Sequence, residues 1–291
     1  MRLKKGLMIS AMASVAVLGL SACSDSEAAA PEPEVQEEVE FEAGTTMAEL
    51  NEAGSITIGT KFDQPLFGLV GPDGDPVGFD VEIGKLIAAE LGIPADGIQW
   101  REAISANREP FIESGEVDLV IATYTINDAR KEVISFAGPY YTAGQDLLVS
   151  ANNEEIEGPE YFTENPDAVV CTVSGSTSEA NISEYTSNVI TAAGYSDCLE
   201  PLRTGAAVAV TTDNVILAGL ADQSDGEFVV VGNPFTEEPY GIGLAKDDTE
   251  FRNFINDTLE ASYEDGTWAE AWEATAGVVL ETPEPPAVDR Y

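Results

Sequence analysis

Three polar stretches in this 291-residue chain carry residue types that can hold a small charged molecule. Residues 123–130, Thr-Tyr-Thr-Ile-Asn-Asp-Ala-Arg, follow a nearly continuous apolar run, and ligands of open α/β sheets bind where strands end. The hydroxyls of Thr123 and Thr125, the loop amides and the forked guanidinium of Arg130 suit a small carboxylate. A polar surface loop with a solvated arginine is the alternative, and the stretch alone does not separate the two.

Two further stretches also follow predicted strands. Residues 174–178, Ser-Gly-Ser-Thr-Ser, lead from a strand into a helix, where free backbone amides can hold an anion. Ordinary capping of that helix by Ser or Thr is the simpler interpretation. Asp213 ends another apolar run, and its carboxylate could cap the next helix or hold an ammonium group.

Basic residues are scarce, which draws attention to the few that lie near strand ends. The chain has 13 Lys and Arg against 53 Asp and Glu, a formal charge of -40, and no histidine. This charge excludes nucleic-acid binding, and the lack of histidine excludes His-based nucleophilic, acid–base and zinc chemistry. Lys61, Arg108 and Arg130 each either bind an anion or balance acidic surroundings. We expect a binding site with no catalytic residue, cofactor or metal.

The elements that would position these residues alternate between strands and helices, which indicates an α/β fold. The helix at 79–91 places Ile83, Leu86, Ile87 and Leu91 on one face. The apolar run at 117–122 is typical of a strand buried on both faces of a parallel sheet. The remaining predicted strands span residues 55–59, 97–100, 141–149, 168–173, 206–211, 228–231 and 241–245, and the remaining helices span 107–114, 179–186, 214–220, 249–263 and a short segment with Trp268 and Trp272.

The N-terminus has the layout of a secretory signal. A basic start is followed by an uncharged apolar run at residues 6–22 that ends in Leu-Ser-Ala before Cys23. These residues resemble a bacterial lipobox, which predicts a signal peptide at 1–22 and a lipid anchor on Cys23; a plain signal peptide with an incidental cysteine is the alternative. We expect residues 23–54 to form an acidic tether and residues 278–291 to form a disordered tail, because both segments are rich in acidic residues or proline.

The two remaining cysteines, Cys171 and Cys198, form an even pair in a chain that we expect to be exported. Such a pair indicates a disulfide, and two reduced, buried thiols are the alternative.

Residues 78–91, Gly-Phe-Asp-Val-Glu-Ile-Gly-Lys-Leu-Ile-Ala-Ala-Glu-Leu, resemble the signature of the extracellular solute-binding proteins of family 3, which serve ABC importers for polar amino acids. The resemblance runs from about Ile56 to Ala276. It implies a type II periplasmic-binding-protein-like fold, in which two α/β lobes joined by two hinge strands close on a ligand. Lobe 1 would span residues 55–143 and 240–277, and lobe 2 residues 144–239.

The resemblance also implies roles for single residues. Thr123 and Thr125 would contact the α-amino and α-carboxylate groups of an amino acid, and Arg130 would pair with the α-carboxylate. Thr177 would add a backbone amide to that carboxylate, and Asp213 would hold the α-ammonium.

The side-chain pocket decides which amino acid binds. Lys61 stands near the point where binders of basic amino acids tend to have a carboxylate, and Arg108 resembles an arginine that glutamate/aspartate binders aim at the distal carboxylate. Two cations predict an acidic ligand, with glutamate ahead of aspartate. Gln64 stands where many relatives have an aromatic clamp, and Ala129 replaces a usual Glu.

The resemblance therefore predicts a monomeric, lipid-anchored binding protein on the extracytoplasmic face of the cell membrane, with the permease of an ABC importer as its partner. Three alternatives stay open: a binder of another polar amino acid such as glutamine, an enzyme on the same scaffold, and a sensor ectodomain.

Overall fold

The computed structural model describes residues 32–37, 39–72 and 74–291. The predicted signal peptide at 1–22 and the predicted lipid anchor Cys23 lie outside these described residues. No helix in the described part of the chain is both long enough and apolar enough to cross a membrane.

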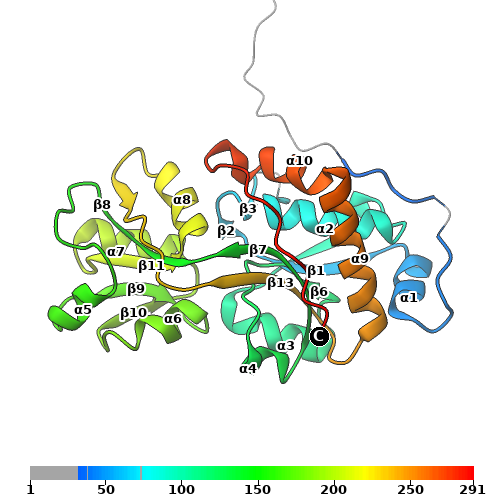
Figure 1. The fold of residues 1–291 in the computed structure, drawn as a ribbon, viewed down its shortest axis with the longest axis horizontal. Coiled ribbons are helices and arrows are strands. Elements are labelled where there is room, and N and C mark those ends of the chain that lie inside the picture. Colours follow the sequence, from blue (N-terminus) through cyan, green and yellow to red (C-terminus); the bar gives the residue numbers. More distant parts are fainter. Residues whose placement is uncertain (1–31, 38, 73) are drawn as a thin grey trace, which may run out of the picture.

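The chain folds into two α/β lobes, each built on a five-stranded mixed sheet, which confirms the predicted fold class (Figure 1). In the first lobe, the strand order is β5 (Ile98–Glu102), β1 (Ile56–Thr60), β6 (Leu119–Val120), β13 (Glu238–Leu244) and β7 (Ser135–Ala143). In the second lobe, it is β10 (Val189–Ala192), β9 (Val170–Val173), β11 (Ala209–Asp213), β8 (Gln145–Ser150) and β12 (Phe228–Val230). A three-stranded sheet of β2 (Asp63–Gln64), β3 (Gly68–Val70) and β4 (Pro76–Val77) lies beside the first lobe.

Two long strands connect the lobes. β7 continues through Gly144 into β8, and β13 returns from the second lobe to pair antiparallel with both β7 and β6. Figure 1 shows β7 and β13 running side by side through the middle of the molecule. Among the described residues, the chain passes between the two five-stranded sheets along these two strands alone, and a hinge motion about them would move the lobes as two bodies.

Helices cover the faces of both sheets. Those of the first lobe are α1 (Thr46–Ala53), α2 (Phe79–Glu90), α3 (Arg108–Ser114), α4 (Asp128–Lys131), α9 (Thr249–Asp265) and α10 (Thr267–Glu273), with 3-10 turns η1 (Ala95–Gly97), η2 (Ser105–Asn107) and η4 (Ala276–Val278). Those of the second lobe are α5 (Glu160–Glu164), α6 (Thr177–Ile182), α7 (Leu199–Thr204) and α8 (Asn214–Asp222), with the 3-10 turn η3 (Ser196–Cys198).

The signature segment forms the start of α2 and packs into an aromatic core. Gly78 has φ +131°, and a Cβ there would overlap the backbone of Phe67, so glycine is required by both conformation and space. Phe79 packs edge-on against Trp268 and Trp272, with ring centroids 5.5 and 5.0 Å apart. This core fixes the direction of α2. Asp80, which follows Phe79 in α2, reaches the site described below.

The structure differs from the predicted tether in the part of it that is described. The Gln36 amide donates to the Ala89 carbonyl at 3.1 Å, the Phe41 ring packs edge-on against Phe254 at 5.6 Å, and α1 buries Leu50. Acidic composition predicted a solvated chain, but a backbone hydrogen bond and two apolar side chains help to dock this segment on the first lobe.

The structure also differs from the predicted disordered tail at 278–291. The Asp289 amide donates to the Gly138 carbonyl at 2.8 Å, and the Tyr291 hydroxyl accepts from the Phe136 amide at 2.8 Å. Arg290 pairs with carboxylates of α9. Proline excludes regular secondary structure from this segment, but it does not prevent an extended chain from docking on a distant surface.

Candidate functional site

The carboxyl ends of parallel strands from both lobes face one another across a small cavity. In the first lobe, β1 leads to Lys61, β5 leads to Arg108, and β6 leads to Thr123. In the second lobe, β9 leads to the loop at 174–178, and β11 ends on Asp213. The cavity is narrow, with a volume of about 10 Å³, and is lined by Ser105, Arg108, Thr123, Ser176, Thr177, Ser178, Tyr195, Asp213 and Ile216.

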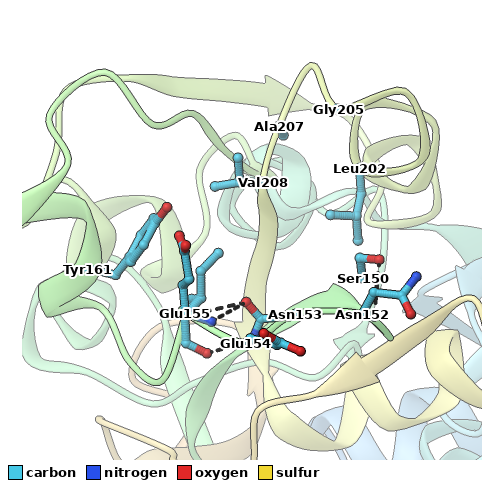
Figure 2. A pocket seen from close by; sticks show the side chains of 11 residues that line it. Ser150, Asn152, Asn153, Glu154, Glu155, Tyr161, Leu202, Gly205, Ala207 and Val208 are labelled. Atoms are coloured by element: carbon cyan, nitrogen blue, oxygen red, sulfur yellow. Dashed lines mark hydrogen bonds between the residues drawn. The ribbon is translucent and has the colours of Figure 1, made fainter.

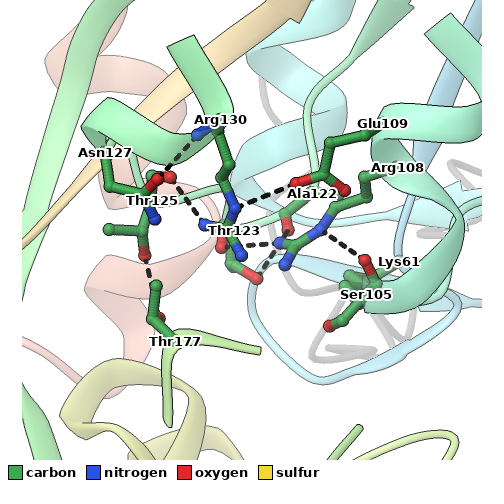
Figure 3. Close-up of polar contacts among 10 residues, drawn as sticks. All are labelled: Lys61, Ser105, Arg108, Glu109, Ala122, Thr123, Thr125, Asn127, Arg130 and Thr177. Carbon is green, nitrogen blue, oxygen red and sulfur yellow. Dashed lines mark hydrogen bonds and ion pairs between the residues drawn. The ribbon is translucent and has the colours of Figure 1, made fainter. Parts of the chain in front are cut away.

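Four of the seven predicted ligand-binding residues line this cavity: Arg108, Thr123, Thr177 and Asp213. The other three, Lys61, Thr125 and Arg130, lie directly behind or beside them, as the following contacts establish (Figure 3).

Thr123 is held in a conformation that β-branched residues rarely adopt, with φ +45°. Its backbone amide donates to Asp80 Oδ2 at 2.7 Å, and the other oxygen of Asp80 accepts from the Tyr140 hydroxyl at 2.6 Å. Asp80 is fully buried, and burial raises its pKa to about 7 although both hydrogen bonds act in the opposite direction. The signature acid therefore fixes the backbone of the cavity loop.

Arg108 is a buried cation that hydrogen-bonds to backbone oxygens. Its Nη1 donates to the carbonyls of Ala122 and Thr123 at 3.1 and 3.3 Å, and its guanidinium stacks 4.2 Å from the centre of the Tyr124 ring. Within residues 32–37, 39–72 and 74–291, Arg108 forms no salt bridge. Burial, and then the charge of Arg130, lower its pKa to about 10, so it stays charged at neutral pH.

Lys61 lies behind Ser105, to whose Oγ its Nζ donates at 2.9 Å. The side chain is only 3% exposed. Burial, followed by the repulsion of Arg108, lowers the pKa of Lys61 to about 7, while Asp63 and Asp80 act to raise it. A ligand carboxylate at Ser105 would favour the charged form of Lys61.

Arg130 is more strongly engaged than the sequence predicts. Its Nε donates to Glu109 Oε1 at 3.0 Å, its Nη1 donates to the Thr125 carbonyl at 2.6 Å, and its guanidinium lies 4.8 Å from the centre of the Tyr124 ring (Figure 3). Thr125 Oγ1 in turn lies 3.5 Å from Thr177 Oγ1 of the second lobe. Arg130 thus supports the cavity rim through Thr125.

The loop at 174–178 does cap a helix, as the simpler interpretation held. Ser176 Oγ accepts from the Glu179 amide at 3.0 Å at the start of α6. Thr177 and Ser178 follow it and line the cavity, so capping and cavity lining occur in the same loop.

Asp213 occupies the capping position of α8, but its side chain does not cap that helix. Its Oδ2 accepts from the Tyr240 hydroxyl at 2.6 Å, whereas its buried Oδ1 has no hydrogen-bond partner among the residues that the structure describes. Burial, and then the charge of Glu238, raise the pKa of Asp213 to about 7, against the attraction of Arg108 and Arg130. A free buried carboxylate oxygen at the cavity wall suits an ammonium ligand.

Sequence reasoning missed five lining residues. Ser176 and Ser178 lie within the loop at 174–178, and Ser105 lies three residues before Arg108, but no role was predicted for any of the three. No sequence pattern pointed to Tyr195 or Ile216 as cavity-lining residues. Tyr195 is brought to the cavity by the turn before η3, and the predicted disulfide between Cys171 and Cys198, which is present, ties this turn to β9.

A wider, shallow hollow of about 430 Å³ lies on the second lobe away from the hinge (Figure 2). Figure 2 shows Glu154, Glu155 and Tyr161 around it, and Asn153 there is already bonded to the Ile156 carbonyl. It contains none of the predicted site residues, so the cavity between the lobes is the candidate site.

Known proteins resemble the chain along almost all of this fold. Residues 56–274 match the family model described as "Bacterial extracellular solute-binding proteins, family 3". The chain is 39% identical over 274 residues to the "Glutamate-binding protein GluB" of Corynebacterium efficiens, covering 89% of this chain and 87% of that one. It is 35% identical over 231 residues to the "ABC transporter glutamine-binding protein GlnH" of Bacillus subtilis, covering 78% and 83%. A solved structure, "An ancestral arginine-binding protein bound to glutamine", is 32% identical with a TM-score of 0.69, covering 76% of this chain and 96% of that chain.

Proposed function

From the premise that this chain belongs to the bacterial extracellular solute-binding proteins of family 3, we propose that it captures an acidic amino acid between its lobes for an ABC importer, with glutamate favoured over aspartate. The family consists of solute-binding proteins, and we assign no catalytic residue.

The pairing of charges around the cavity carries this proposal. Arg108 is a buried cation with hydrogen bonds to neutral oxygens, and Asp213 is a buried acid with one free oxygen in the described structure. They come from opposite lobes and line the same cavity. An amino acid brings both complementary charges, because its carboxylate can pair with the cation and its ammonium with the acid.

The distal carboxylate of the ligand would lie toward Ser105, where the side chains of Lys61 and Arg108 meet. The α-carboxylate would lie toward Thr125, Arg130 and the Thr177 amide, and the ammonium would lie at Asp213 with the hydroxyl of Thr123 near it. Since Arg130 is already paired with Glu109, its guanidinium would be shared between that acid and the ligand.

The relatives support an amino-acid ligand. They do not decide between glutamate and glutamine, because one is described as glutamate-binding and another as glutamine-binding. Glutamate and glutamine differ in charge at one end. The buried guanidinium of Arg108 and the charged form of Lys61 favour the carboxylate, since an amide would leave them without an anion.

Calorimetry against the standard amino acids tests the proposal, after unfolding and refolding the protein to remove any ligand carried through purification. We expect glutamate to bind, aspartate to bind less tightly, and glutamine to bind more weakly than glutamate by roughly 2–5 kcal/mol. Equal affinities for glutamate and glutamine would contradict the acidic-pocket assignment. Binding of no amino acid would contradict the proposed function as a whole.

We also propose that Cys23 carries the lipid that anchors the mature chain at the extracytoplasmic face of the membrane. The supporting observation is the lipobox-like sequence before this residue. Cells that express the chain should incorporate a clickable fatty acid into it, and Cys23→Ala should abolish the label while the protein is still made. Equal labelling of the variant would refute the anchor.

A further inference from the structure

One carboxylate joins the two lobes outside the ligand cavity. Asp63 lies on β2 beside the first lobe, and its Oδ2 accepts from the backbone amide of Tyr195 at 2.7 Å. The same oxygen lies 3.5 Å from the amide of Ser196. Tyr195 belongs to the second lobe and lines the cavity, so the contact crosses between the lobes next to the site.

Glycine at position 194 makes this approach possible. A Cβ on Gly194 would lie 2.9 Å from Asp63 Cγ and would overlap Oδ2. The atoms that such a methyl group would meet belong to the carboxylate of Asp63, so alanine at 194 would displace that carboxylate and leave its charge in place.

The turn that carries the accepting amides is fastened to its own lobe. Residues 194–198 lead to Cys198, which is bonded to Cys171 of β9, and β9 continues into the cavity loop at 174–178. The amide of Tyr195, its ring and the cavity loop are therefore parts of one body. When the lobes separate about β7 and β13, Asp63 and the Tyr195 amide must part and be hydrated instead.

We propose that the contact between Asp63 and the amides of Tyr195 and Ser196 is a closure latch, which holds the lobes together over a bound ligand and slows its release. Asp63 acts on the ligand through the second lobe and is a positioning residue. The inference rests on the proposed capture of a small ligand between the lobes, and it does not depend on which amino acid is bound.

The charge of Asp63 also acts on the ligand, apart from the hydrogen bonds that Asp63 accepts. The carboxylate of Asp63 is one of the acids that raise the pKa of Lys61, so it favours the charged lysine but also adds negative potential near an anionic ligand. Arg108, Arg130 and Asp80 also act on Lys61 at this end of the cavity, and Asp197 of the turn accepts from the amide of Gly194 at 3.4 Å. These two effects of the charge oppose each other, so faster release from Asp63→Ala alone does not identify a latch. Faster release from a variant that breaks the contact and keeps the charge does.

Stopped-flow displacement of glutamate from the full mature domain separates these outcomes. Two variants test the latch: Asp63→Ala removes both charge and contact, and Gly194→Ala removes the contact and keeps the charge. We expect both to raise the dissociation rate by about tenfold, as suits loss of one charge-assisted hydrogen bond in a half-buried position. The association rate of Gly194→Ala should stay within about twofold of wild type.

Two control variants match these changes away from the cleft. Asp96→Ala removes an exposed acid of the first lobe, and Gly158→Ala adds a methyl group to the second lobe that meets only the ends of the Glu160 and Asn233 side chains. Both should release glutamate at the wild-type rate. Thermal unfolding of each variant verifies that it is folded, and small-angle scattering at saturating ligand should give a larger mean radius for the two latch variants alone.

The latch would be overturned if both latch variants released glutamate at the wild-type rate. It would also be overturned if Asp63→Ala bound glutamate more tightly while Gly194→Ala kept the wild-type rates. If wild-type protein does not bind glutamate, the acidic-ligand proposal fails by itself. The same rate comparison then uses the amino acid that calorimetry identifies, so the two failures are distinguishable.

Discussion

Replacing Asp213 with asparagine should weaken ligand binding and stabilise the ligand-free fold at the same time. Asp213 is 3% exposed, and its pKa lies at about 7 instead of the ordinary 3.8. An ionised carboxylate with this shift costs the folded state on the order of 4 kcal/mol. Asparagine keeps an oxygen that can accept from the Tyr240 hydroxyl at the position of Oδ2, but it carries no charge to bury.

The sign of the stability effect depends on pH. Because the folded pKa lies above the unfolded value, the folded state binds more protons, and the stability of the wild type falls as pH rises from about 4 to about 7. Below about pH 4 the acid is neutral in both states, so Asp213→Asn should match the wild type there. At pH 8 the variant should be more stable by up to about 4 kcal/mol, measured by urea unfolding without ligand.

Binding should change in the opposite direction. Loss of the charged partner of the ligand ammonium should cost roughly 2–5 kcal/mol, which is about 30- to 5,000-fold in the glutamate dissociation constant at pH 8. Calorimetry measures this loss. A glutamate affinity within about threefold of wild type would refute the ammonium site, and a variant less stable than wild type at pH 8 would refute the cost assigned to the buried carboxylate.

Asp146 provides a matched control in the same sheet. It is 1% exposed and lies opposite Thr212, one residue from Asp213, but its oxygens accept from the amides of Leu147 and Gly232. Asp146→Asn should therefore leave glutamate affinity unchanged. If Asp146→Asn lost as much glutamate affinity as Asp213→Asn, the loss would come from removing any buried acid of this sheet. It would then not identify Asp213 as the ammonium site.

Three other predictions concern the cations and the disulfide. Arg130→Ala should abolish binding of every amino acid, because the α-carboxylate is common to all of them, whereas Arg108→Ala should reduce the preference for glutamate over glutamine; wild-type glutamate affinity in Arg130→Ala would refute its role. The pKa of Lys61 is about 7 before binding, and a ligand carboxylate favours its charged form. Glutamate affinity should therefore fall by up to about tenfold per pH unit between pH 7 and 9, and Lys61→Met should remove this slope. A wild-type affinity that does not change with pH would contradict the role of Lys61. Replacing Cys171 and Cys198 together with serine opens a loop with a sequence separation of 27 and should cost roughly 3–4 kcal/mol in urea unfolding; an unchanged midpoint would show that the bridge adds no stability.

Local patterns were sufficient for most of the elements. The amphipathic spacing predicted a helix over 249–263, and α9 spans Thr249–Asp265. The buried strand predicted at 117–122 forms only a two-residue ladder, β6, because the chain then turns into the cavity loop at Thr123. Composition was a poorer guide at the termini, where docking depends on partners far along the chain, such as Phe254 for Phe41 and Phe136 for Tyr291.

The sequence also predicted part of the candidate site, where residue position along the chain was enough. Residues that follow apolar strands could be found from their position, and four of them line the cavity. Tyr195 could not be found in this way, because it reaches the cavity only through the disulfide-bonded turn and the closed arrangement of the lobes. The ion pair between Arg130 and Glu109, on neighbouring helices, was likewise beyond any sequence pattern.

The sequence by itself determined which charges are available: no histidine, few cations, and an aspartate and several hydroxyls at strand ends. These are local properties, since a residue's type and its place in a strand–loop–helix pattern need no knowledge of the rest of the chain. Only the tertiary structure decided which of those charges are left without partners. Burial and pairing depend on groups from both lobes, and they leave Asp213 with a free oxygen and Arg108 without a salt bridge among the described residues, while Arg130 and Asp63 are engaged.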